Sequence, residues 1–97
     1  MAYQLMAEKH GDTNVAMLRE RLAQLDVIEF FPVHVDDRSV ALGISIPFKV
    51  TEDARFESEL IELLSFLIVE QQFVVTDLFT GRAVSSDGIV ELPRKIK

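Results

Sequence analysis

The chain has 97 residues, of which 48% are hydrophobic and 27% are charged, so it is long enough for one hydrophobic core and too short for two ordinary domains. Ten Lys and Arg residues against sixteen Asp and Glu residues give a net charge of −6, which disfavours binding to nucleic-acid phosphates or anionic lipid. Because the chain has no cysteine, disulfides, thiol catalysis and thiolate metal sites are excluded.

The first predicted elements are an undecided N-terminal segment and a helix. Residues 2–9 fit a strand, a helical lead-in or a disordered start, and the sequence leaves these alternatives open. Gly11 breaks the pattern, and Asp12 or Thr13 can then accept a first-turn amide as the N-cap of a helix running to about residue 26. The apolar side chains that follow helical spacing in this segment are Val15, Leu18, Leu22 and Leu25.

Two strands are predicted next. Residues 27–35 are rich in β-branched and aromatic side chains, and Pro32 places this strand at a sheet edge or a bulge because it cannot donate a ladder hydrogen bond. After a turn at residues 36–38, residues 39–48 alternate between large apolar and small side chains, which predicts a strand with one face in the core. The large side chains are Val40, Leu42, Ile44, Ile46 and Phe48, and the small face carries Ser39, Ala41, Gly43, Ser45 and Pro47.

A second helix carries more apolar side chains than one face can bury. Thr51 can cap this helix, which we expect to end near residues 71–72. At about 100° per residue, one broad stripe comprises Phe56, Leu60, Leu63, Leu64, Leu67 and Ile68. Phe66 and Val69 fall on the opposite side, beside Glu62. This surplus predicts a second buried surface, and a protein partner is the simplest way to cover it.

The C-terminal third predicts short strands. Residues 73–79 and 82–85 read as strands joined by a turn, and Asp87-Gly88 predicts a hairpin into a strand at residues 89–92 that Pro93 ends. The element order is then βαββαβ followed by a C-terminal hairpin, the order of a ferredoxin-like sandwich. We predict an α+β fold with two layers, in which two helices pack on one face of a mostly antiparallel sheet of four or five strands.

We expect residues 1–93 to form a single α+β domain and residues 94–97 to form a basic C-terminal tail. The N-terminal residues lack the charged start and apolar run of a signal peptide. The longest uncharged apolar stretch, residues 63–69, is far shorter than the ~20 residues that span a bilayer. We therefore expect a cytoplasmic protein whose partners are neither nucleic acid nor membrane.

The polar residues suggest little chemistry. His34 and Asp36 lie in the densest polar cluster and are the one ligand-binding pair that the sequence suggests, although Asp36-Asp37 is also ordinary turn chemistry. A metal site would require His10 to converge with His34 and an aspartate, and we predict no metal site, no cofactor and no catalytic residue. The acidic residues of the second helix are interpreted as a solvated face, with docking of a basic partner as the alternative.

The leading hypothesis is a small acidic module that binds protein rather than catalysing a reaction, and that forms a homodimer. The predicted interface residues are Ile28, Phe30, Phe66 and Val69, of which Phe30, Phe66 and Val69 are expected not to be wholly buried in a monomer. One alternative is a chaperone or an immunity or antitoxin-like protein that neutralises a specific partner. Another alternative is a small-ligand-binding protein or enzyme that uses the open face of the sheet.

Overall fold

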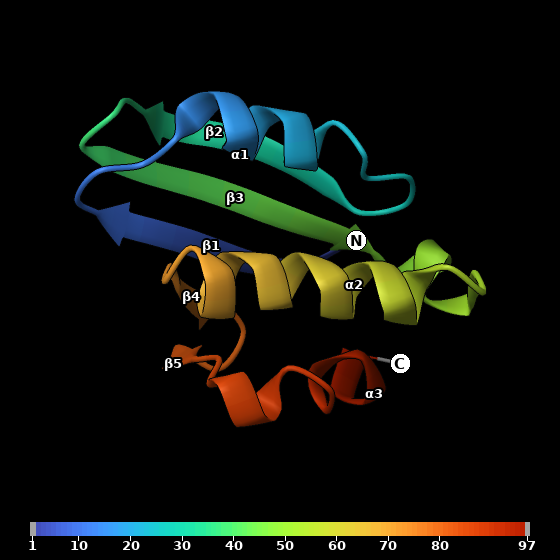
Figure 1. Ribbon diagram of the computed structural model, residues 1–97. Helices are drawn as coiled ribbons and strands as arrows, with labels where there is room; N and C mark the ends of the chain where they lie inside the picture. Colours follow the sequence, from blue (N-terminus) through green and yellow to red (C-terminus); the bar gives the residue numbers. More distant parts are fainter. Residues whose placement is uncertain (1, 97) are drawn as a thin grey trace.

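The protein is an α+β domain built on a five-stranded antiparallel sheet (Figure 1). A computed structural model describes residues 2–96. The strands are β1 (Ala2–His10), β2 (Glu29–Val35), β3 (Ser39–Pro47), β4 (Val74–Asp77) and β5 (Arg82–Ala83). The helices are α1 (Val15–Leu22), α2 (Phe56–Leu64) and α3 (Leu92–Ile96), together with the 3₁₀ helices η1 (Phe48–Glu52) and η3 (Ser86–Gly88) and the π-helix η2 (Ser65–Glu70).

The strand order is β2-β3-β1-β4-β5, so β2 and β5 are the two edges. The edge position predicted for residues 27–35 is confirmed, and the strand also carries a bulge between Pro32 and His34. Among the alternatives for residues 2–9, the strand is the one observed, because β1 pairs with β3 on one side and with β4 on the other. The α+β class is confirmed, and the finer ferredoxin-like assignment stays a prediction.

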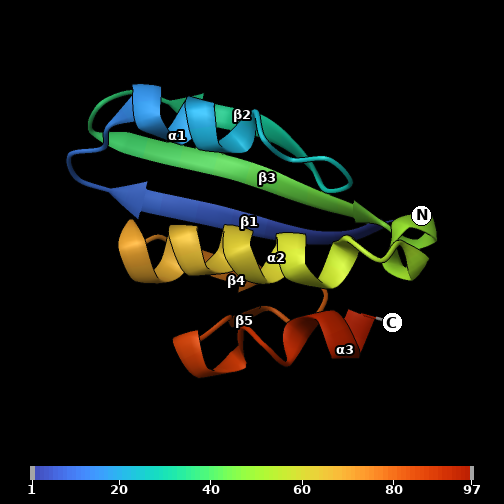
Figure 2. The same cartoon turned by 45° about the vertical axis from the view of Figure 1, so that its right-hand side comes forward.

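One face of the sheet is buried beneath the helices. Leu5 of β1 lies opposite Ile44 of β3, and both side chains are fully buried on this face. In Figures 1 and 2, α1 and α2 lie on this side, and α3 lies beside α2 near β5. In the described part of the chain, the other face of the sheet carries no helix.

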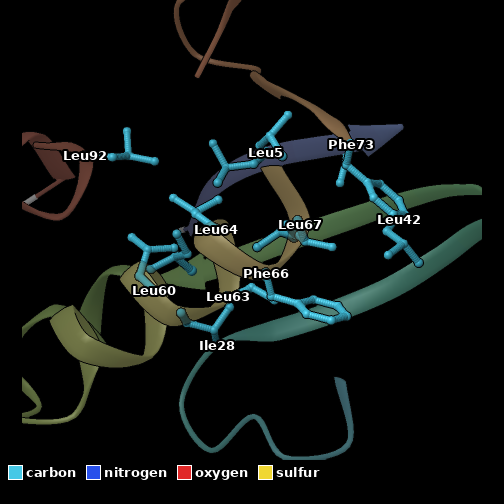
Figure 3. Close-up of a cluster of buried hydrophobic side chains, with 14 of the residues drawn as sticks. Leu5, Ile28, Leu42, Leu60, Leu63, Leu64, Phe66, Leu67, Phe73 and Leu92 are labelled. Atoms are coloured by element: carbon cyan, nitrogen blue, oxygen red, sulfur yellow. The ribbon is translucent and has the colours of Figure 1, made fainter. Parts of the chain in front are cut away.

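The core is the layer between the sheet and the long α2–η2 helix (Figure 3). The labelled leucines of this helix, Leu60, Leu63, Leu64 and Leu67, are all buried against strand residues such as Leu5 and Leu42. Burying such side chains contributes on the order of 1.5–3 kcal/mol each. The predicted apolar stripe of this helix is therefore the face that holds the two layers together.

Both predicted helix caps differ from the observed ones. The N-cap of α1 is Asn14, whose side chain accepts the amide of Met17 at 3.0 Å, and α1 ends at Leu22 rather than near residue 26. Thr51 caps no α-helix, because it lies in η1 and its hydroxyl donates to the carbonyl of Phe48. Instead Asp53 accepts the amide of Arg55 just before α2 begins.

The second helix ends close to the predicted residues 71–72, but its last turns form a π-helix, which is wider than an α-helix. Within η2, the amide of Gln71 donates to the carbonyl of Phe66, a five-residue spacing that is characteristic of a π-helix. The segment ends at Gln72, which has a φ of 58° and so terminates the helix in the left-handed region. The extra residue in these turns changes which side chains after Leu64 point to the core.

The predicted strand at residues 89–92 is wrong. These residues form a turn that leads into α3, where Pro93 lies in the first turn and needs no intrahelical amide partner. The side chains of Ile89, Leu92 and Ile96 are buried at helix-like spacing. Arg94 and Lys95 are exposed on α3, so three of the four predicted tail residues belong to this helix, and residue 97 lies outside the described residues. The domain boundary at residue 93 stays a prediction.

Candidate functional site

The edge strand β2 exposes an unusual number of large apolar side chains. Phe30, Phe31 and Val33 are 38%, 46% and 59% exposed, and they are almost consecutive on a strand that has a neighbour on one side only. Single exposed apolar residues are common on protein surfaces, whereas a contiguous group on a sheet edge marks an interaction surface or an aggregation hazard. We call Phe30, Phe31, Val33 and the groove described below the β2 edge surface.

Phe31 extends the β2 edge surface onto the uncovered face of the sheet. It lies opposite Gly43 of β3, and its ring occupies the space where a Cβ of residue 43 would lie. Glycine at this position is therefore required for the ring to lie against the strand. The predicted small-residue face is real, but next to Gly43 it is filled by an aromatic ring, which disfavours a small-molecule pocket at that point.

Phe30 faces the helix side, where α1 and β2 enclose an apolar groove of about 320 Å³. The groove is lined by Leu18, Arg19, Leu22, Phe30, Pro32, Val33, His34, Val35 and Leu42. Leu18 and Leu22 are buried residues of α1, so they form its wall, and Leu42 comes from β3. Arg19 and His34 supply its polar margin. The β2 edge surface thus wraps around the edge of the sheet from one face to the other.

The backbone of β2 is not suited to extending the sheet. Pro32 has no N–H to donate, and the bulge between Pro32 and His34 shifts the register of the strand. Both features are devices by which edge strands avoid continuous pairing with another strand. This edge therefore offers side chains, rather than a continuous row of backbone hydrogen-bonding groups, to its surroundings.

The predicted ligand pair, His34 and Asp36, is a turn contact. Nε2 of His34 lies 2.7 Å from Oδ2 of Asp36, and both side chains are exposed. The other carboxylate oxygen accepts the amides of Arg38 and Ser39, each at 2.8 Å. These two amides, followed by His34, hold the pKa of the Asp36 carboxyl below its usual value.

The histidines do not assemble a metal site. His10 lies at the end of β1 opposite Ser39, two strands away from β2. Within residues 2–96, no cluster of three or more His, Asp or Glu side chains is arranged to hold a metal ion. His34 and Asp36 therefore border the β2 edge surface as polar neighbours, and we assign them no chemistry of their own.

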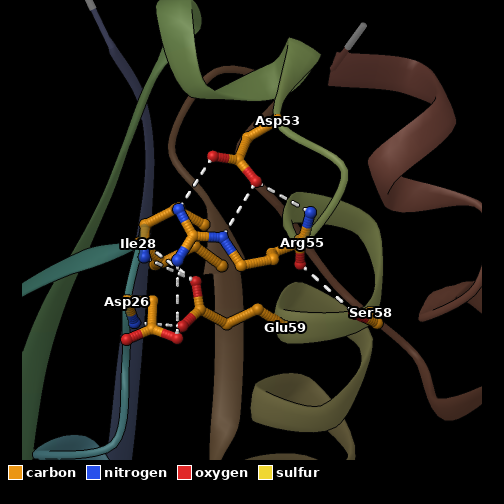
Figure 4. A network of polar contacts seen from close by, with 7 residues as sticks. Asp26, Ile28, Asp53, Arg55, Ser58 and Glu59 are labelled. Carbon is orange, nitrogen blue, oxygen red and sulfur yellow. Dashed lines mark hydrogen bonds and ion pairs between the residues drawn. The ribbon is translucent and has the colours of Figure 1, made fainter.

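Two acidic residues at the start of the second helix, Asp53 and Glu59, have a structural task (Figure 4). The carboxylate of Glu59 accepts three consecutive backbone amides, from Asp26, Val27 and Ile28, which ties α2 to the loop before β2. Arg55 bridges the carboxylates of Asp53 and Asp26 at 3.0 and 3.9 Å. Its hydrogen bond lowers the pKa of the Asp53 carboxyl to about 2. This network positions β2 relative to α2.

Two of the four predicted interface residues lie inside the subunit. Ile28 is buried, and Phe66 is only 4% exposed, so the expectation that Phe66 is incompletely buried in a monomer is wrong. The ring lies within the hydrophobic core, and the guanidinium of Arg21 on α1 lies 5.2 Å from the centre of the ring. Phe30 and Val69 are exposed as expected, with Val69 at 58%.

Sequence reasoning missed Phe31, Val33 and the groove. The sequence pattern of residues 27–35 predicts that Phe31 and Val33 lie on a strand, but whether their side chains are covered depends on which strands lie beside it. The available signal was Pro32: a proline that forces a strand to an edge also implies that the neighbouring apolar side chains lack a second strand to pack against.

No protein-family model, curated protein or solved structure matches this chain, so its function is inferred from geometry alone. Among residues 2–96, none of the helices combines the length and apolar character needed to cross a lipid bilayer.

Proposed function

We propose that this chain is a protein-binding module that self-associates, and that a second copy covers its β2 edge surface. The observation that carries the proposal is the cluster of Phe30, Phe31 and Val33 on an edge strand that cannot be extended by ladder pairing. A surface of this kind is costly to leave in water, since each exposed apolar Å² costs roughly 25 cal/mol.

A second copy fits because the β2 edge surface has both a groove and projecting apolar side chains that could fill the groove of another copy. Two copies related by a two-fold axis present the same residues to one another. If two β2 strands lie antiparallel, Glu29 of one copy is brought to the end where Arg19 and His34 lie in the other. The opposite charges of Glu29 on β2 and Arg19 on α1 therefore favour an antiparallel pair of copies despite the net charge of −6.

The mode of association follows from Pro32 and the bulge. Because these interrupt the hydrogen-bonding edge, we expect packing of side chains into the groove rather than a continuous ten-stranded sheet. Phe31 and Val33 would be the residues with the largest effect, since they are the most exposed apolar side chains of the strand.

The test compares two valines of equal exposure. Val33→Ser and Val69→Ser remove the same apolar group at sites that are 59% and 58% exposed. Sedimentation velocity over a range of concentrations should show that Val33→Ser raises the dimer dissociation constant about tenfold or more, whereas Val69→Ser leaves it unchanged. Phe31→Ser should act as Val33→Ser does.

Two outcomes would contradict this assignment. A wild-type chain that stays monomeric at all concentrations would show that no second copy covers the surface, and a stronger effect of Val69→Ser would move the interface to the second helix. Circular dichroism and thermal unfolding of the variants control for loss of fold.

We also propose that residues 2–77 form a ferredoxin-like unit. The support is the order β1, α1, β2, β3, α2, β4, with the helices on one face of the sheet. An experimental structure of the chain, compared strand by strand with known sandwiches of this type, tests the assignment.

A further inference from the structure

A second concave surface lies at the opposite edge of the sheet, away from β2. A cleft of about 610 Å³ is formed between β1, the β4–β5 turn, η3 and α3. The side chains that line it include Asp77, Phe79, Thr80, Arg82, Ser85 and Lys95. This volume is in the range of small-molecule sites, and the lining combines aromatic, cationic and hydroxyl groups.

The floor of the cleft is held rigidly by Asp77. This side chain is only 6% exposed, and its two oxygens accept the hydroxyl of Tyr3 and the amides of Phe79 and Thr80. Gly81, with a φ of 75°, closes the same turn through its amide to the carbonyl of Asp77. The carboxylate is thus fully engaged within the protein, and the groups above it are kept in place.

Two cations reach the cleft from different elements. Arg82 lies on β5 and Lys95 on α3, and within residues 2–96 neither side chain takes part in an ion pair or a side-chain hydrogen bond. Of the described residues that line the cleft, Asp77 alone is acidic. A local excess of positive charge on a chain with a net charge of −6 favours an anionic occupant.

Two hydroxyl groups at the cleft are oriented to donate. The oxygen of Thr80 accepts the amide of Arg82 at 3.3 Å, and the oxygen of Ser85 accepts the amide of Gly88 at 3.1 Å. Each hydroxyl therefore has its oxygen fixed by the backbone while its hydrogen remains available for a ligand. Together with the two cations, they provide several donors, as a phosphate group requires.

An aromatic platform lies at the same cleft. Phe79 is 84% exposed, and its one ring contact in the described residues is with Tyr3, at 5.8 Å between ring centres. An exposed Phe on a tight turn gains nothing from folding, but it offers a face on which a planar ring can stack. Its place beside Arg82 puts this face next to the cationic groups.

We propose that this cleft binds a small ligand in which a planar ring carries a phosphate group, such as a nucleoside or aryl phosphate. Arg82 and Lys95 neutralise the phosphate, Thr80 and Ser85 donate hydrogen bonds to it, and Phe79 stacks on the ring. The site is independent of self-association, since it lies at the β5 edge and not at the β2 edge.

The test uses AMP, phenyl phosphate and adenosine as probes in amide NMR titrations of the full chain. AMP and phenyl phosphate should produce saturable shifts at Gly81 and Gly88, with dissociation constants below about 10 mM. Adenosine, which has the ring and sugar without the phosphate, should bind at least about fivefold more weakly than AMP.

Three variants locate the site. Arg82→Gln, Lys95→Gln and Phe79→Ala change exposed side chains, and each should weaken AMP binding about fivefold or more. Arg38→Gln removes the same charge from an exposed residue at the far side of the sheet and should leave binding unchanged.

The proposal is overturned if neither phosphate probe shifts the cleft amides, if adenosine binds as tightly as AMP, or if Arg38→Gln weakens binding as much as Arg82→Gln. Sedimentation of the same variants separates this result from the proposed function, because all three cleft variants should retain the wild-type dissociation constant of the dimer.

Discussion

Phenylalanine has three different roles in this chain, and residue type alone does not separate them. Phe56 is completely buried in the core, Phe31 lies on a glycine at a sheet edge, and Phe79 projects from a turn. What distinguishes these side chains is the element beside them. The same holds for the carboxylates, since Asp77 and Glu59 organise backbone amides while Glu62 is solvated.

Tyr3 provides a direct probe of one such environment, because it is the only tyrosine in the chain. Burial, followed by its hydrogen bond to Asp77, raises the pKa of the Tyr3 phenol from 10.0 to about 12. An alkaline titration followed by phenolate absorbance should therefore show the folded chain ionising near pH 12 and the urea-unfolded chain near pH 10.

The sign of the pH dependence follows from this shift. Since the folded phenol holds its proton more tightly than the unfolded one, its contribution to stability is complete below pH 10 and is lost as the pH rises towards 12. Asp77→Asn should move the folded transition part of the way towards 10, because burial remains when the charge is removed. A folded transition already at the unfolded value would contradict the described contact.

At the scale of elements, regular patterns were the predictable part of the fold. The alternation of residues 39–48 predicted β3 and its buried face, although Phe48 lies in η1 and is 40% exposed rather than buried in the core. The helical stripe from Phe56 to Ile68 predicted the inner face of α2 and η2. These features depend on local periodicity alone. The wider π-helical turns of η2 and the contact of Arg21 with the Phe66 ring depend on interactions between elements, and so the position of Phe66 could not be predicted.

Phe66 and Val69 now provide a test of this correction. Phe66→Ala removes a buried ring from the hydrophobic core and should lower the free energy of unfolding by about 3–5 kcal/mol. Val69→Ala changes an exposed side chain and should stay within about 0.5 kcal/mol of wild type. Urea unfolding measures both, and equal effects would show that Phe66 is not the buried member of the pair.

The link between α2 and the loop before β2 gives a further prediction. Glu59→Gln replaces a carboxylate that accepts three amides with a group whose NH₂ faces those donors. We expect a loss of about 1–3 kcal/mol in the free energy of unfolding. Glu62→Gln, on the exposed side of the same helix, is the matched control and should have little effect. If the two variants unfold alike, the amide contacts of Glu59 contribute nothing to stability.

At the scale of the whole molecule, the strand order decides which surfaces are available. Because β2 is at the end of the sheet, side chains on both of its faces and its free edge together form a single exposed surface. Sequence periodicity carries no information about strand order, so this surface could not be predicted. The C-terminal third was predicted least well. Asp87-Gly88 predicted a hairpin. Instead, Ile89, Leu92 and Ile96 are buried at helix-like spacing, and α3 forms one wall of the cleft at β5.

The two proposed sites lie at opposite edges of the same sheet, β2 for a second copy and β5 for a small anion. Each edge strand lacks a second neighbour in the subunit, and each is accompanied by a concave surface. A dimer formed through β2 would leave the cleft at β5 open to solvent in each copy, so both proposals can hold for the same molecule.

The central claim is that a second copy covers the β2 edge surface. The most direct measurement is a search for intermolecular nuclear Overhauser effects in a mixture of carbon-labelled and unlabelled chains. We predict cross-peaks that join Val33 of one chain to the groove residues Leu18 and Leu22 of the other. A mixture with no intermolecular cross-peaks, or with cross-peaks that arise only from Val69 and its neighbours, would contradict the account.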